Sequence, residues 1–129
     1  MTFSQLQIST AFSLLSSTIS IDALINRAKS LQYKALAITD RNNLYGVLPF
    51  YEACKRENIK PIIGLTADIE RVDGHVHSIV LLAKNQQGYQ NLLMISTEIL
   101  TSHQKVLTGE RLQEFGDNLI AIKIGRAHV

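Results

Sequence analysis

Several residue types are scarce in this chain of 129 residues, and each scarcity excludes a class of protein. Tryptophan is absent and proline occurs twice, which excludes collagen-like and proline-rich chains. A single cysteine, Cys54, cannot form a disulfide within the chain, so we expect a reducing compartment. No apolar run approaches the roughly 18 residues of a membrane span, and the start of the chain lacks the pattern of a signal peptide. We therefore expect a cytoplasmic protein without a membrane partner.

An excess of charge of one sign is also missing. Thirteen Lys and Arg against eleven Asp and Glu give a net charge of +2, whereas a nucleic-acid surface normally shows a clustered excess of basic residues. Hydrophobic residues make up 46% of the chain and charged residues 19%, which is typical of a globular α/β protein and not of a disordered chain. Composition alone therefore favours no function.

Strand-like and helix-like segments alternate along the chain. Apolar residues recur at helical spacing over residues 21–31, after Ser20 as a suitable N-cap, and residues 34–39 form an apolar run that suits a buried strand. The expected strands cover residues 3–8, 34–39, 60–69, 75–83 and 119–123, and the expected helices cover 21–31, 47–57, 86–99 and a short stretch after Thr108. Asp73 and Gly74 predict a tight hairpin turn. The order of elements predicts βαβ units and a largely parallel sheet, open or barrel-like.

Five collinear blocks of sequence resemble one known family. They read LQISTAFSLL (6–15), ALAITDRNNLYG (35–46), FYEACK (50–55), IKPIIG (59–64) and LLAKN followed by GYQNL (81–92). The first two resemble the opening motifs of the PHP domain, the polymerase and histidinol phosphatase domain. The last two are similar to the version at the N-terminus of bacterial DNA polymerase III alpha subunits, the C-family replicative polymerases. Several blocks at correct spacing are a specific signal, although any one of them would be weak.

The resemblance implies a fold, a parent protein and partners. The implied fold is α/β, a distorted β/α barrel of the PHP type, of which residues 1–123 form the N-terminal part; a complete α/β barrel needs about twice this length. The implied parent is a DNA-directed DNA polymerase of chromosomal replication, which uses magnesium in a palm domain beyond this chain. The implied partners are the thumb and palm of the same chain, other replisome subunits and, through the full-length protein, DNA.

The last six residues, IGRAHV at 124–129, interrupt the pattern of a strand. They match the translation of a common short-read sequencing adapter, so we expect a non-native tail. The alternative is an ordinary strand end followed by a turn. We assign no functional role to Arg126 or His128.

The metal site that the resemblance implies is degenerate in this sequence. Active PHP domains hold metal ions with imidazoles and carboxylates at the C-terminal ends of barrel strands, and those ions activate water against a phosphate ester. The six positions that match family ligands hold Gln7, Ser9, Asp40, Arg41, Thr66 and Ser78. Of these, Asp40 alone keeps the family's ligand type, and Arg41 adds a fixed positive charge. We therefore predict a metal-free scaffold with no catalytic residue, no cofactor and no hydrolytic activity of its own.

Other residues that could take part in chemistry are interpreted as structural. His75 and His77 could serve zinc as an H-x-H pair, but no Cys or further His lies nearby, so we expect exposed residues beside a turn. Cys54 is expected to be a buried structural thiol, and Asp40 to make a structural hydrogen bond or ion pair. Basic residues near the end of the 47–57 helix, Lys55, Arg56 and Lys60, are expected to compensate the helix dipole rather than bind DNA.

Two alternative functions remain open. One is a stand-alone metal-dependent phosphoesterase, similar to histidinol phosphatase, or a proofreading nuclease; the missing ligands argue against both. The other is an interaction module that never belonged to a polymerase, against which the length of a complete barrel argues.

Overall fold

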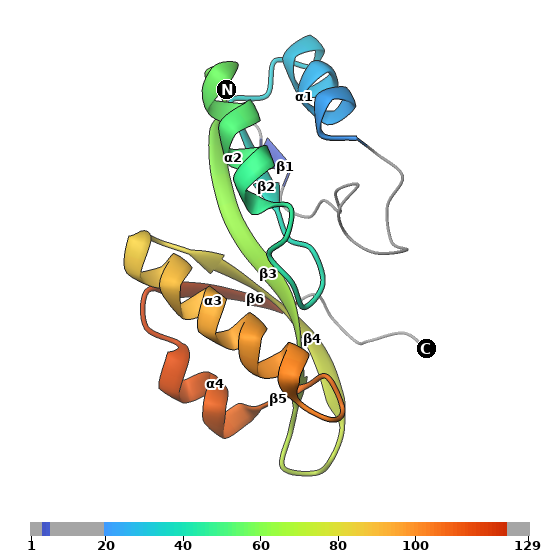
Figure 1. Cartoon of the computed structure of the whole chain (residues 1–129), viewed down its shortest axis with the longest axis vertical. Helices are drawn as coiled ribbons and strands as arrows, with labels where there is room; N and C mark the ends of the chain where they lie inside the picture. Colours follow the sequence, from blue (N-terminus) through green and yellow to red (C-terminus); the bar gives the residue numbers. More distant parts are fainter. Residues whose placement is uncertain (1–3, 6–19, 124–129) are drawn as a thin grey trace.

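The computed structural model describes residues 4–5 and 20–123 (Figure 1). The helices are α1 (Ile21–Ser30), α2 (Val47–Arg56), α3 (Gln86–Thr101) and α4 (Gly109–Phe115). The strands are β1 (Ser4–Gln5), β2 (Ala35–Ile38), β3 (Lys60–Glu70), β4 (Val76–Ala83), β5 (Leu107–Thr108) and β6 (Leu119–Lys123). Most of the strand expected at 3–8, the candidate ligands Gln7 and Ser9, and the expected tail at 124–129 lie outside the described residues.

The six strands form one sheet in the order β1-β2-β3-β4-β6, with β5 also paired to β3. β1 with β2, β2 with β3, and β3 with β5 are parallel, whereas β3 with β4 and β4 with β6 are antiparallel. The expectation of a largely parallel sheet is therefore corrected to a mixed sheet. The physical reason is the predicted tight turn, in which Gly74 adopts a φ of 87° and returns the chain directly as an antiparallel neighbour.

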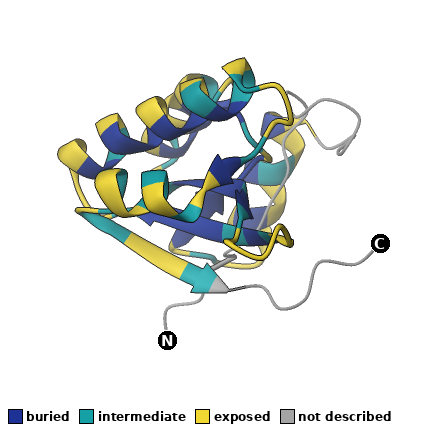
Figure 2. Cartoon of the chain, turned by 90° about the horizontal axis from the view of Figure 1, so that it is seen from below, coloured by how far each residue is buried: buried dark blue, intermediate teal, exposed yellow. Residues whose placement is uncertain are grey.

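β3 joins two hydrophobic clusters because it is long enough to serve two sets of partners. Its residues 60–63 pair with β2, and its residues 64–70 pair with β4. The first cluster packs α1 and α2 against β2 and the start of β3, around Ile25, Leu36, Ile38 and Phe50. The second packs α3 against β3 and β4, around Leu65, Leu81, Leu92 and Ile95. Figure 2 shows the buried helix faces turned toward the strands and the exposed faces turned away.

Local capping chemistry sets where three of the helices begin. The side chain of Ser20 accepts a hydrogen bond from the Ala23 N–H, Asn85 accepts one from Gly88, and Thr108 accepts one from Arg111. Asn58 directly follows the C-cap of α2 and adopts a left-handed φ of 59°, which ends the helix. No helix in the described ranges is long and apolar enough to cross a bilayer.

Cys54 is a structural thiol, as the sequence predicts. It lies in α2 with 0% of its surface exposed, inside the first hydrophobic cluster. Burial raises the pKa of this thiol to about 11, so the reactive thiolate is scarce at neutral pH.

Candidate functional site

The segment after β2 lies against β3 and carries the first described site residues. The Thr66 N–H donates to the carbonyl of Asp40 at 3.0 Å, and the Asn42 N–H donates to the carbonyl of Thr66 at 2.8 Å. Arg41 and Thr66 consequently form a parallel bridge beyond the end of β2. This backbone pairing holds Arg41 beside β3, just beyond the C-terminal end of β2. The C-terminal ends of barrel strands are where the family resemblance implies metal ligands.

Arg41, Asp68 and Ser78 form a hydrogen-bonded group, which we call the Arg41 cluster. The Arg41 guanidinium donates through Nη1 to Asp68 Oδ1, and also to Ser78 Oγ at 3.2 Å. The Ser78 hydroxyl in turn donates to Asp68 Oδ1 at 2.9 Å. Asp68 and Ser78 are direct register partners across β3 and β4. The cluster therefore ties the segment after β2 to the β3–β4 hairpin.

Asn42 and Ser96 extend the cluster to α3. Asn42 adopts a φ of 61°, and its side-chain amide lies 3.4 Å from Asp68 Oδ2, while the Asp68 N–H lies 3.4 Å from Asn42 Oδ1. The Ser96 hydroxyl, on α3, donates to the carbonyl of Asn42 at 3.0 Å. The cluster is thus anchored to three separate elements.

Asp40 and Thr66 are buried and do not point toward solvent. Asp40 is 1% exposed and Thr66 is 2% exposed. The Thr66 hydroxyl donates to the carbonyl of Thr39 at 2.7 Å, so it is engaged in holding β2 to β3. Burial of both groups is consistent with the structural role expected for Asp40.

Asp68 is the important residue that the sequence reasoning missed. The sequence placed Arg41 beside Asp40, yet the ion pair that the structure shows for Arg41 is with Asp68. A signal existed in the sequence, because side chains two residues apart in a strand lie on the same face, which puts Asp68 beside Thr66. What the sequence did not contain was the register that brings Arg41 to that face.

The two histidines differ from each other. His75 is exposed, and its backbone N–H donates to Asp73 Oδ1 at 2.9 Å. This hydrogen bond lowers the pKa of the Asp73 carboxyl. This confirms the exposed position expected for His75. The expectation is wrong for His77, which is half-buried and whose Nδ1 has no hydrogen-bond partner among the described residues. Pairing with Ile69 on the core side of β3 explains the burial.

The residues that the structure describes do not fit the metal cluster that the fold family implies. Within the described residues, no group of three or more His, Cys, Asp or Glu side chains is placed to hold a metal ion. The Asp68 carboxylate, which lies beside the candidate positions Arg41 and Ser78, is bound by the Arg41 cation instead. A divalent ion beside a fixed guanidinium would be strongly repelled. Gln7 and Ser9 lie outside the described residues, and neither is an imidazole or a carboxylate.

Two solved structures share the fold of the described elements. An amidohydrolase from Chromobacterium violaceum with bound sulfate and no metal matches with a TM-score of 0.60 and 21% identity, over 74% of this chain and 32% of that chain. A putative metal-dependent phosphoesterase from Bifidobacterium adolescentis matches with a TM-score of 0.54 and 12% identity, over the same shares. The chain therefore has part of the fold of amidohydrolase and phosphoesterase barrels.

The chain belongs to the PHP domain family, whose model matches residues 5–128. The resemblance read from the sequence is confirmed by relatives that carry the name DNA polymerase III subunit alpha. The one from Bacillus subtilis (strain 168) is 40% identical over 127 residues, or 97% of this chain. Those from Staphylococcus epidermidis and Staphylococcus aureus (strain COL) are 45% and 41% identical, over 91% and 95% of this chain. The chain spans 11% to 12% of the length of these relatives.

The Arg41 cluster should show energetic coupling in a double-mutant cycle. We expect Arg41→Met and Asp68→Asn to be coupled by about 1 kcal/mol in the free energy of unfolding, because Ser78 and Asn42 hold the Asp68 carboxylate in place. Urea titration followed by circular dichroism measures each variant.

The matched control for this cycle is the exposed pair of Lys29 and Glu57, whose side-chain atoms lie 2.7 Å apart. Lys29→Met and Glu57→Gln should be coupled more weakly than Arg41→Met and Asp68→Asn, because the Glu57 side chain is more exposed than that of Asp68. Coupling of Arg41 to Asp68 no larger than in this control would contradict a structural role for the cluster.

Proposed function

We propose that this chain is the N-terminal PHP segment of a DNA polymerase III alpha subunit, and that its former metal site serves as a metal-free scaffold. The full protein would be a DNA-directed DNA polymerase of chromosomal replication. The identity to polymerase alpha subunits over nearly the whole chain supports the parent protein. The observation that carries the scaffold role is the Arg41 guanidinium, bonded to both Asp68 and Ser78.

The scaffold works by replacing the charge that metal ions would supply. In an active site of this family, cations neutralise the carboxylates at the ends of the strands. In this chain Arg41 places a permanent positive charge next to the Asp68 carboxylate, whose side chain is only 21% exposed. Removing the cation would leave a partly buried carboxylate without compensation, which is costly. Arg41 therefore keeps the hairpin joined to β2 without a bound ion.

This segment alone would not hydrolyse a phosphate ester. Activation of water needs a metal or a general base close to the phosphate ester. The described cluster consists of a guanidinium, a carboxylate paired to it and a hydroxyl, so no group in it is free to accept a proton. Polymerisation would belong to a magnesium-binding palm outside this chain. The thumb and palm, other replisome subunits and DNA would be its partners.

The coding sequence downstream of this segment, read from intact genomic DNA, tests the proposed parent protein. We expect the reading frame to complete a barrel and to continue into a palm domain with paired acidic residues. A stop codon soon after a completed barrel would contradict the proposal and favour a stand-alone phosphoesterase or an interaction module. The same sequence shows whether residues 124–129 are native.

A further inference from the structure

Basic side chains that are far apart in the sequence gather at one end of the sheet. Lys34 directly precedes β2 and Lys60 begins β3, and the Lys60 N–H donates to the Lys34 carbonyl at 2.9 Å. Lys84 follows the last residue of β4, which runs in the opposite direction and so ends toward the start of β3. The last turns of α1 and α2 lead into these strand starts and add Arg27, Lys29, Lys55 and Arg56. The opposite end, at the β3–β4 turn, carries Asp68, Glu70 and Asp73 together with Arg71.

The three lysines at the strand ends, like Arg27 and Lys55, are not neutralised by a nearby carboxylate of the described residues. Lys29 lies 2.7 Å from Glu57, and Arg56 lies 4.0 Å from Asp22. Lys34, Lys60 and Lys84 are exposed and form no ion pair within 4.0 Å with another described residue. The nearly balanced net charge of the chain thus conceals a locally positive end. From the sequence alone, Lys60 was expected only to compensate the dipole of the neighbouring helix.

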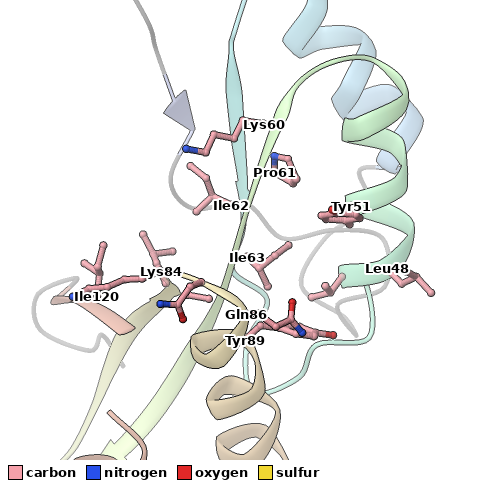
Figure 3. Close-up of a pocket in the computed structure, with 14 residues that line it drawn as sticks. Leu48, Tyr51, Lys60, Pro61, Ile62, Ile63, Lys84, Gln86, Tyr89 and Ile120 are labelled. Atoms are coloured by element: carbon pink, nitrogen blue, oxygen red, sulfur yellow. The ribbon is translucent and has the colours of Figure 1, made fainter. Parts of the chain in front are cut away.

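A groove opens at this basic end. It has a volume of about 790 Å³ and lies between α2, the start of β3, the end of β4 and the start of α3 (Figure 3). Lys60 and Lys84 line one side of it together with Ile120, and Tyr51 and Leu48 line the other. Tyr51 is 44% exposed, and the ammonium of Lys55 lies 5.9 Å from the centre of its ring. The groove therefore combines unpaired ammonium groups with an accessible aromatic face.

We propose that this groove binds single-stranded DNA. Flexible polyanionic strands bind where lysines follow the phosphates and an aromatic ring stacks on an unpaired base, and both features are present. No described strand pairs with residues 60–63 on the side away from β2, but a peptide strand is a poorer occupant of this edge because Pro61 has no N–H to donate. DNA binding is inferred from the lysines and the tyrosine ring of the groove and not from the polymerase assignment, so the two proposals can fail separately.

Fluorescence anisotropy of a labelled oligothymidylate of about 12 nucleotides, titrated with the 129-residue chain at low salt, tests the proposal. We expect saturable binding. The logarithm of the binding constant should fall with the logarithm of the salt concentration with a slope of about −2, for phosphate contacts from Lys34, Lys60 and Lys84. The double variant Lys60→Glu with Lys84→Glu should bind at least about tenfold more weakly and with a shallower slope. Tyr51→Ala should lose about tenfold in affinity and keep the slope, because stacking involves no counterion.

The matched control makes the same change in charge at the other end of the sheet. Arg71 follows β3 and Lys105 precedes β5, which pairs with the last residues of β3. Compared at about 0.1 M salt, Arg71→Glu with Lys105→Glu should change affinity by about twofold or less. Eight strand residues, or roughly 26 Å, separate Arg71 from the groove residue Ile63, which exceeds the Debye length of about 10 Å. An equal loss in this control, binding of duplex as tight as binding of the single strand, equal competition by polyglutamate, or no saturable binding would each overturn the proposal. Circular dichroism of every variant verifies that the fold is intact.

Discussion

Replacing Gly88 by alanine should destabilise the chain by about 3 kcal/mol, a large share of the stability of a domain of this size. Gly88 lies in the first turn of α3, where a Cβ atom would sit 2.2 Å from the carbonyl oxygen of Asn118 and 3.2 Å from the Cα of Ala83. Both neighbours are backbone atoms, so rotation of a side chain cannot relieve the overlap. The loss should exceed the gain of about 1 kcal/mol that alanine brings to a helix.

Gly109 provides the control for this substitution because it also begins a helix. Its nearest contact for an added Cβ is the carbonyl of Glu70, at 4.0 Å. Gly109→Ala should therefore leave stability unchanged within about 0.5 kcal/mol, or raise it slightly. Urea unfolding followed by circular dichroism compares the two variants with the parent chain. If both alanine variants were equally stable, the close approach of Gly88 to the backbone of Asn118, which directly precedes β6, would be contradicted.

The second large effect concerns Arg41 and metal affinity. We expect a variant with Gln7→His, Ser9→His and Ser78→His to bind zinc weakly as long as Arg41 remains. Adding Arg41→His should tighten zinc binding by at least about a hundredfold, because the change removes a positive charge from the site, frees Asp68 and supplies another imidazole. Thr66 is left unchanged, since it is buried and its hydroxyl bonds to the Thr39 carbonyl.

Isothermal titration with zinc compares these two variants, and circular dichroism establishes that each is folded. The unmodified chain and the single variant Arg41→His serve as the matched controls, and neither should bind zinc stoichiometrically. Equal zinc affinity with and without Arg41 would show that its guanidinium does not oppose a metal at this place.

Local patterns predicted much of the fold. Ser20 is recognisable as an N-cap because its side chain bonds to an amide within the same turn, and the Asp73–Gly74 turn follows from the conformational freedom of glycine. These signals lie within a few residues of one another. They could therefore be read without knowing how distant segments meet.

The site was only partly predictable, because it depends on distant segments. Position 41 was recognised as an altered ligand, but its partner Asp68 is 27 residues further along the chain, and their meeting depends on strand register. The same limit concealed the basic end, which collects Lys34, Lys60 and Lys84 from three separate segments. The mixed sheet was missed for a related reason: a hairpin was expected, but its effect on the strand directions of the whole sheet was not.

Metal content tests the central claim most directly, that a guanidinium occupies the place of a metal cluster. The unmodified chain, purified and loaded with zinc, manganese or iron, is dialysed and then measured by elemental analysis. The account predicts far less than about one equivalent of any of these metals per chain, because the ligands are absent and Arg41 repels divalent ions. Retention of about two or three equivalents per chain would contradict it.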